Sequence, residues 1–182
     1  MVCFANTCRS PVAESLLAAT TSSTGDVDVT SRGTEGGPGI VPVPMGEALV
    51  EAGVDVVGPL GRVLDRDTAR GADLLLFMER ALLREAVVRD TSVWPKSFTL
   101  REFARRAMID PPDPQSESFE QWLALLHAKR SRTDLLGADT TDDVPDPGLS
   151  GSLDDYREMI ADLRRDVGRI APMLTGWTST SE

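Results

Sequence analysis

The sequence has few of the residues that build metal centres and disulfide frameworks. It contains one histidine, His127, and two cysteines, Cys3 and Cys8, among 182 residues. One histidine and two cysteines give no cluster with the spacing of metal ligands, so we expect no metal and no cofactor. Two cysteines five positions apart also do not resemble the disulfide framework of a secreted protein. A reducing, cytoplasmic setting is therefore predicted.

Basic residues and long apolar runs are also scarce. There are 19 Lys and Arg against 29 Asp and Glu, which gives a formal net charge of −10. This balance argues against a nucleic-acid partner held by general electrostatics. No apolar run is long enough to span a membrane, so no membrane partner is expected. The first motif begins at residue 3, and we therefore expect no signal peptide before it.

Against this background one short segment carries most of the information. Residues 3–9, Cys3-Phe4-Ala5-Asn6-Thr7-Cys8-Arg9, are followed at once by Ser10-Pro11. The backbone N–H groups of such a loop can form a nest for a tetrahedral oxyanion. A helix beginning at the proline would direct its positive end to the same point, and an arginine would add two parallel hydrogen bonds. Phe4 to Ser10 are therefore predicted to bind phosphate.

Cys3 is the predicted nucleophile of this loop. The positive field that attracts the anion also favours a thiolate, so attack of the Cys3 sulfur on phosphorus is expected. Asn6 tolerates the left-handed backbone angles that a curled loop needs, and Ser10 can donate a hydrogen bond to the sulfur. Cys8 is a candidate redox partner for an oxidised Cys3. The alternative is that both cysteines are small buried apolar residues, as most free cysteines are.

The rest of the chain alternates between helical and strand patterns. Strands are expected at 26–31 and 73–78, and 98–103 fits either type. Such alternation implies a parallel sheet wrapped by helices on both faces, with ligands at the carboxyl ends of the strands. Only two residues precede Cys3, so the first strand is stunted or the true start lies upstream. Helices are expected at 11–20, 45–52 with Gly53 as a cap, 65–71, 79–89, 116–132 and 153–171 with Pro172 as a stop.

Residues 3–11 resemble the signature of the low-molecular-weight protein tyrosine phosphatases, usually C-x-G-N-x-C-R-S-P, with Ala5 in place of the glycine. The resemblance implies an α/β, phosphatase I-like single domain whose four-stranded parallel sheet has the order 2-1-3-4. It also implies a cysteine-dependent phosphate-monoester hydrolase that forms a phosphocysteine intermediate. On this interpretation the domain covers 1–175, with a helical insertion at about 110–140 and a frayed tail at 176–182.

The same resemblance supplies a general acid. The family's acid lies in an Asp-Pro pair just before the final helix, a position that Asp146-Pro147 occupies. A carboxylic acid there can protonate the leaving oxygen. The neighbouring Asp142 and Asp143 are expected to tolerate conversion to amides. Ser31 resembles a family serine that hydrogen-bonds to the loop asparagine.

The sequence leaves the substrate open. Family members often carry aromatic residues after the Asp-Pro pair, whereas Gly148-Leu149-Ser150 follow here. Trp94 or Trp122 would have to supply an aromatic wall, since Tyr156 lies on the last helix. The family implies that the substrate is a phosphorylated bacterial protein, and a small phosphate ester is equally compatible with the sequence. We expect the protein to be a monomer or a weak dimer. An arsenate reductase that uses an external small thiol and an inactive phosphate-binding module also fit the loop.

Overall fold

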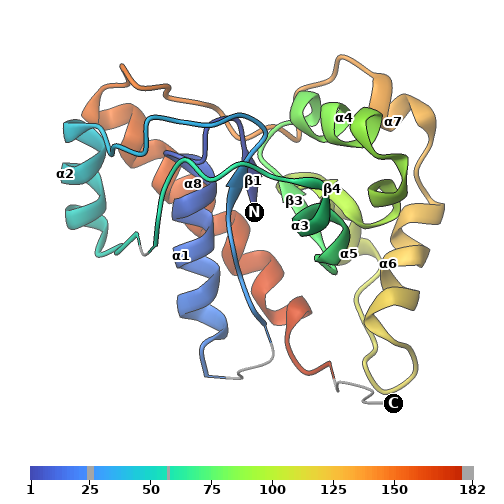
Figure 1. Ribbon diagram of the computed structural model, residues 1–182. Coiled ribbons are helices and arrows are strands. Elements are labelled where there is room, and N and C mark those ends of the chain that lie inside the picture. The colour runs from blue at the N-terminus through green and yellow to red at the C-terminus, as the bar shows by residue number, and fades with distance from the viewer. Residues whose placement is uncertain (24–26, 57, 178–182) are drawn as a thin grey trace.

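A four-stranded parallel sheet with the order β2-β1-β3-β4 forms the centre of the protein, as a computed structural model shows (Figure 1). The structure describes residues 1–23, 27–56 and 58–177. The predicted fold class and strand order are thus confirmed. The strands are short: β1 spans Val2–Cys3, β2 Arg32–Gly33, β3 Leu75–Phe77 and β4 Ser97–Thr99.

Helices cover both faces of this sheet. In Figure 1, α1, α2 and α8 lie to one side of the strands, and α4 and α7 lie to the other. The helices are α1 Arg9–Thr21, α2 Val43–Ala52, α3 Arg66–Gly71, α4 Arg80–Arg89, α5 Leu100–Ile109, α6 Phe119–Ala128, α7 Arg132–Leu136 and α8 Leu153–Leu174, with a short 3-10 helix η1 at Thr91–Lys96.

The apolar run of β3 packs against both helical layers because successive side chains of a strand point to opposite faces. Leu75 and Phe77 belong to the apolar cluster on the α4 side of the sheet. Leu76 and Met78 belong to the larger cluster that includes residues of α1, α5 and α8. A strand buried on both faces needs a continuous apolar sequence, and the apolar run that contains β3 ends at Met78, before Glu79.

Several boundaries follow from capping groups. Gly53 ends α2 in the left-handed conformation, with φ 62°, as the sequence predicts. The Asp65 side chain accepts a hydrogen bond from the Thr68 N–H and fixes the start of α3. The expected helix at 116–132 is shorter: α6 covers Phe119–Ala128, starting at the capping box of Ser118. The capping box of Ser131 then starts the separate helix α7 at Arg132, where the predicted helix ends.

Other boundaries differ from the prediction. The strand predicted at 26–31 is wrong: β2 lies at Arg32–Gly33, where the Arg32 N–H donates to the Met1 carbonyl at 2.9 Å. Asp26 itself lies outside the described residues. The ambiguous stretch 98–103 contains the end of β4 and the start of α5. Pro172 does not stop α8, which continues to Leu174.

The final helix and α6 are joined by an aromatic cluster. The ring centroid of Trp177 lies 5.2 Å from that of Phe119 and 5.6 Å from that of Trp122. Trp177 is therefore packed rather than frayed, which corrects that part of the predicted tail; 178–182 lie outside the described residues. Among the helices that the structure describes, none combines the length and apolar character needed to cross a bilayer.

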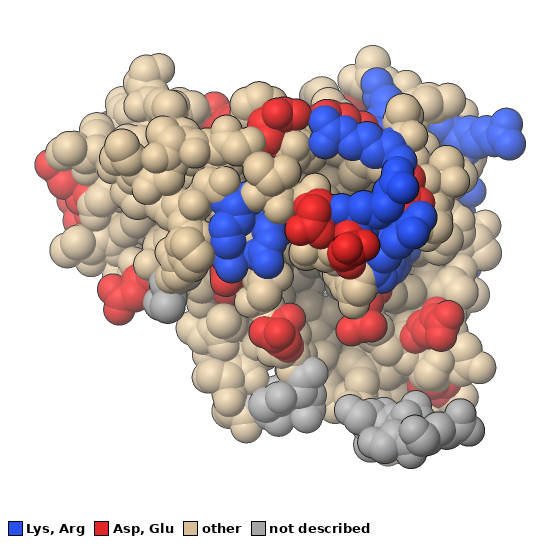
Figure 2. Space-filling view, viewed as in Figure 1, with Lys and Arg blue, Asp and Glu red and all other residues tan. Residues whose placement is uncertain are grey.

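Charged side chains of both signs gather near the middle of the face seen in Figure 2, where Lys and Arg lie next to Asp and Glu. Many of the charged side chains form ion pairs between separate elements of the protein. The Arg70 Nε of α3 lies 2.7 Å from the Asp90 Oδ2, just after α4, and Arg89 lies 3.1 Å from Glu35. Such exposed pairs each contribute little to stability, so the apolar clusters on the two faces of the sheet account for most of the packing.

Candidate active site

The phosphate loop, residues 3–10, connects the carboxyl end of β1 to α1. Asn6 is the one non-glycine residue with a positive φ, 49°, in the described part of the chain. The asparagine therefore occupies the left-handed position that its residue type predicts. Ala5 needs no such angle, so the replacement of the family glycine leaves the backbone of the loop unstrained there.

Asn6 joins the phosphate loop to two other segments. Its Nδ2 donates to the Ser31 Oγ at 2.7 Å and to the Ser10 Oγ at 3.1 Å. Its Oδ1 accepts from the Arg62 N–H at 3.0 Å, and its carbonyl accepts from the Gly61 N–H at 2.9 Å. The expected bond between Ser31 and the loop asparagine is thus confirmed. The segment around Gly61 was not anticipated, since no pattern in the sequence distinguishes it from an ordinary turn.

The two cysteines lie in different chemical surroundings. The Ser10 hydroxyl donates to the Cys3 Sγ at 3.0 Å, and Cys3 is buried at the base of the loop. Burial, with the negative charges of Asp146 and Cys3, raises the pKa of the Cys8 thiol to about 12. Cys8 is therefore a neutral thiol at pH 7, and neither cysteine is in a disulfide. Of the two sulfurs, Cys3 Sγ is the one for which the described residues show a hydrogen-bond donor within the loop.

The Arg9 guanidinium is buried and is held by three acceptors. Its Nη1 lies 2.5 Å from the Glu79 Oε1 and donates to the Val144 carbonyl at 3.0 Å. Its Nη2 donates to the Asp146 Oδ2 at 2.6 Å. Arg9 and Asp146, 137 positions apart in sequence, are thus in direct contact. Glu79, the residue before α4, was not predicted, because no spacing in the sequence links it to Arg9.

Asp142 and Asp143 hold the acid segment, residues 142–146, against the body of the protein. The Asp142 Oδ2 lies 2.7 Å from Arg105 and 3.4 Å from Arg80. The Asp143 carboxylate accepts from the Arg80 backbone N–H at 2.7 Å, at the first residue of α4. Burial raises the pKa of Asp143. Asp142 and Asp143 therefore hold the segment in place. The expectation that they tolerate conversion to amides does not fit these contacts, so their amide variants are poor controls for Asp146.

A turn after the acid segment fixes Asp146 from the other side. The Asp146 Oδ1 accepts from the Gly148 N–H at 3.0 Å, and Gly148 has a φ of +65°. The Tyr156 hydroxyl donates to the Gly148 carbonyl at 2.7 Å. Tyr156 is fully buried, and desolvation raises the pKa of its phenol. The tyrosine therefore supports the acid turn rather than facing a substrate.

Neither tryptophan considered as an aromatic wall is placed to act as one. Trp122 is fully buried, and its indole N–H donates to the Asp110 carbonyl. Trp94 packs edge-on against His127, with centroids 5.0 Å apart, which gives that histidine a packing role. Phe4, directly after Cys3, is 51% exposed. The aromatic ring carried by the phosphate loop itself is thus available to a ligand.

Comparisons with known proteins agree with this geometry. Residues 1–138 match the family described as low molecular weight phosphotyrosine protein phosphatase. A probable low molecular weight protein-tyrosine-phosphatase, EpsP of Ralstonia solanacearum, is 32% identical over 127 residues, which cover 69% of this chain and 86% of EpsP. The family match ends before the acid segment, so the position of Asp146 depends on the contacts described above.

Solved structures show the same fold. A low molecular weight protein tyrosine phosphatase from T. tengcongensis is 26% identical, with a TM-score of 0.65 and 93% of each chain covered. A mutant of the YwlE arginine phosphatase, with a phosphorylated active-site serine, is 24% identical, with a TM-score of 0.68 and coverage of 95% of this chain and 92% of that one.

Proposed function

The chain belongs to the family of low molecular weight phosphotyrosine protein phosphatases, and we propose that Cys3, Arg9 and Asp146 carry out its hydrolysis of phosphate monoesters. The observation that supports these roles is the contact of Arg9 with Asp146 at 2.6 Å, beside a cysteine that accepts a hydrogen bond from Ser10. With these contacts, a nucleophile, a planar cation and a carboxylic acid gather at the phosphate loop.

In the first step the Cys3 thiolate attacks phosphorus. A sulfur–phosphorus bond forms, and the bond from phosphorus to the leaving oxygen breaks. Asp146 gives its proton to that oxygen, so that an alcohol or phenol departs. The loop N–H groups and Arg9 bear the charge on the remaining phosphate oxygens. The Ser10 hydroxyl, 3.0 Å from the sulfur, stabilises the thiolate before attack.

In the second step water hydrolyses the phosphocysteine. The Asp146 carboxylate takes a proton from the water, whose oxygen bonds to phosphorus while the sulfur–phosphorus bond breaks. Inorganic phosphate leaves, and the Cys3 thiolate and the acid form of Asp146 are restored. One acid therefore serves both steps, first as donor and then as base.

Arg9 must change partners during this cycle. Its guanidinium is bound by Asp146 and Glu79 in the structure. A phosphate dianion offers two oxygens in the geometry that a guanidinium fork prefers. Binding of the dianion would release Asp146 from the ion pair and leave it near the leaving oxygen. Glu79 remains as the carboxylate that orients Arg9.

We favour a phosphorylated protein as the substrate. The Ralstonia relative is described as a probable protein-tyrosine phosphatase, and the half-exposed ring of Phe4 beside Cys3 offers an apolar face for an aryl group. A structural neighbour is described as an arginine phosphatase, so phosphoarginine is the second side chain to test. A bacterial, cytoplasmic setting and a monomer or weak dimer stay predictions; a reducing compartment would keep Cys3 and Cys8 as thiols.

The decisive experiment compares Cys3→Ser with Cys8→Ser on para-nitrophenyl phosphate. We expect Cys3→Ser to lose turnover while still binding inorganic phosphate, because the nest and Arg9 remain. Cys8→Ser should retain turnover, since its neutral thiol is no nucleophile. Turnover by Cys3→Ser at the wild-type rate would refute the proposed mechanism. Arsenate-dependent oxidation of an added small thiol, without phosphatase activity, would instead identify an arsenate reductase.

A further inference from the structure

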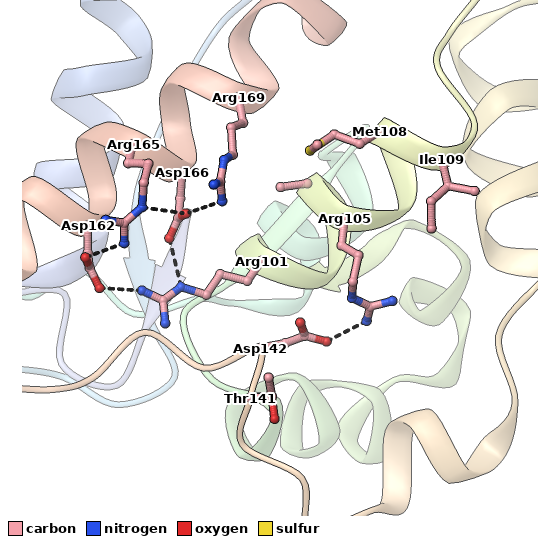
Figure 3. A pocket seen from close by; sticks show the side chains of 11 residues that line it. Arg101, Arg105, Met108, Ile109, Thr141, Asp142, Asp162, Arg165, Asp166 and Arg169 are labelled. Carbon is pink, nitrogen blue, oxygen red and sulfur yellow. Dashed lines mark hydrogen bonds and ion pairs between the residues drawn. The ribbon is translucent and has the colours of Figure 1, made fainter.

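A cleft between α5 and α8 lies beside the acid segment and has no role in the chemistry described so far. Its volume is about 740 Å³, within the range of pockets that bind ligands. Figure 3 shows its side chains converging from the two helices and the loop before Val144. We call this cleft the arginine cleft. The lining residues that matter for its chemistry are Arg101, Arg105, Met108, Ile109, Asp142, Asp162, Arg165, Asp166 and Arg169.

We propose that the arginine cleft binds an acidic segment of the phosphorylated protein substrate. The inference rests on the proposed function and names the class of substrate for that site. It also separates a protein substrate from a small phosphate ester, because a small ester bound at Cys3 has no atoms that extend into the cleft.

The charge at the surface of the arginine cleft is positive, although the whole chain carries −10. Four arginines face three aspartates, which leaves one positive charge. The aspartates are covered, with side chains 2 to 20% exposed. Arg105, Arg165 and Arg169 are 51 to 53% exposed. A molecule approaching the cleft therefore meets guanidinium groups, while the carboxylates lie beneath them.

These arginines are held in position but keep donor groups for a ligand. Arg105 binds Asp142 through Nη2 at 2.7 Å, and Arg169 binds Asp166 through Nη1 at 3.4 Å (Figure 3). A guanidinium has five N–H donors, so one contact leaves several for another carboxylate. Pre-positioned side chains lose less conformational entropy on binding than free ones do, which favours use of this cleft as a recognition surface.

The rim of the cleft adds an apolar contact. Met108 and Ile109, on the last turn of α5, are 60% and 70% exposed. Adjacent exposed apolar side chains beside charged groups are typical of protein interaction sites. A carboxylate-rich segment that also carries an aliphatic side chain matches this combination. A bare inorganic anion would leave the apolar rim unused.

The arginine cleft lies next to a second hollow that contains Asp146, and Asp162 stands between the two. That residue lines both the cleft and a smaller hollow of about 290 Å³ that contains Pro145, Asp146 and Pro147. A chain bound at the phosphate loop could follow this path. The hollow is acidic, since Asp155 and Glu158 also line it. The acidic residues of the substrate must therefore be separated from the phosphorylated residue by a neutral or basic spacer.

The test uses phosphotyrosine peptides that differ in one block. The block is Glu-Glu-Leu-Glu, Ser-Ser-Leu-Ser or Lys-Lys-Leu-Lys. In separate peptides it stands before or after the phosphotyrosine, and a Gly-Ser spacer of about two, four or six residues lies between the two. We expect the wild-type protein to hydrolyse one Glu-block peptide with a kcat/KM at least about threefold above the Ser-block peptide, the scale of a few exposed ion pairs. The preference should shrink in high salt.

The variant Arg165→Glu/Arg169→Glu should remove this preference, and Met108→Ser/Ile109→Ser should lower kcat/KM for the Glu-block and Ser-block peptides alike, since both carry the leucine. Both variants should leave para-nitrophenyl phosphate hydrolysis unchanged. Arg66→Glu/Arg132→Glu, at the exposed first residues of α3 and α7, is the charge-matched control and should keep the preference. Thermal unfolding verifies that each variant is folded. A wild-type protein that hydrolyses the aryl phosphate but treats all blocks alike, or prefers the Lys block, overturns the docking proposal. Failure to hydrolyse the aryl phosphate would instead count against the proposed function.

Discussion

The phenol of Tyr156 donates a 2.7 Å hydrogen bond to the carbonyl of Gly148, two residues beyond Asp146. Because the Gly148 N–H is in turn bonded to the Asp146 carboxylate, the tyrosine fixes the turn that presents the acid. A buried hydroxyl on the final helix thereby positions a group that it does not touch.

Removal of that hydroxyl should therefore affect proton donation more than binding. Tyr156→Phe keeps the ring but leaves the Gly148 carbonyl without its donor. We expect kcat for phenyl phosphate to fall about tenfold, a part of the 10²- to 10⁴-fold that general acid catalysis supplies. Para-nitrophenyl phosphate, whose anion leaves without help, should change less than about twofold. Stopped-flow or steady-state kinetics on the two substrates measures the difference.

The double variant Tyr156→Phe/Asp146→Asn distinguishes positioning from general destabilisation. If the tyrosine acts through Asp146, adding Tyr156→Phe to Asp146→Asn should cause no further leaving-group effect. Loss of rate for both substrates by the same factor would mean that the tyrosine only maintains the fold.

Asp146→Asn should itself slow substrates in proportion to the basicity of the leaving group. We expect phenyl phosphate to lose at least about 100-fold and para-nitrophenyl phosphate far less. Asp154→Asn is the matched control, because Asp154 lies in the first turn of α8 with its side chain 88% exposed. Its kinetics should equal those of the wild type. A leaving-group effect in Asp154→Asn that is absent from Asp146→Asn would require a new assignment of the acid.

Arg9→Lys should show that the planar shape of the cation matters as well as its charge. An ammonium group cannot bind the phosphate fork and also contact Glu79 and Val144 as Arg9 does. We expect a loss of at least about 100-fold in kcat, the effect of losing one oxyanion donor. A loss below about threefold would show that Arg9 supplies no such donor.

Oxidation of Cys3 should lead to a disulfide with Cys8 at a rate that rises with pH. The attacking species is the Cys8 thiolate, and with a pKa of about 12 its population increases about tenfold for each pH unit below that value. Mass spectrometry after mild peroxide at about pH 6.5, 7.5 and 8.5 should show more loss of two hydrogens at the higher pH. Cys8→Ser should accumulate sulfinic acid instead. A pH-independent yield of disulfide would contradict this route.

The phosphate loop could be predicted from the sequence because its information is local. Asn6 and Ser10 are four residues apart, and their roles follow from backbone preference and hydroxyl chemistry. β3 was predicted for the same reason, since a strand buried on both faces has a distinctive apolar run. Asp146 was assigned from its place before the last helix, and its role as the acid stays a prediction.

The partners that orient these groups were not predictable from local patterns. Glu79, Tyr156 and Arg105 reach the site or its acid segment from three separate elements, and no spacing in the sequence links them to Arg9 or Asp146. β2 was misplaced because the alternating valines before it suggest a strand, while the pairing depends on where the chain meets β1. Tertiary contact, rather than propensity, decided its position.

The bonds of Asn6 to Ser31 and to the backbone at Gly61 and Arg62 have a consequence for the order of folding. The bonds to Ser31 and Arg62 close loops of 25 and 56 residues, and closing long loops slows folding because chain entropy is lost before the contact forms. A peptide that contains the whole cysteine-to-arginine motif, but ends before Ser31, lacks the braces that shape the nest. Acquisition of anion affinity during refolding would then mark a late event, and phosphate would act on the finished protein as a stabilising ligand.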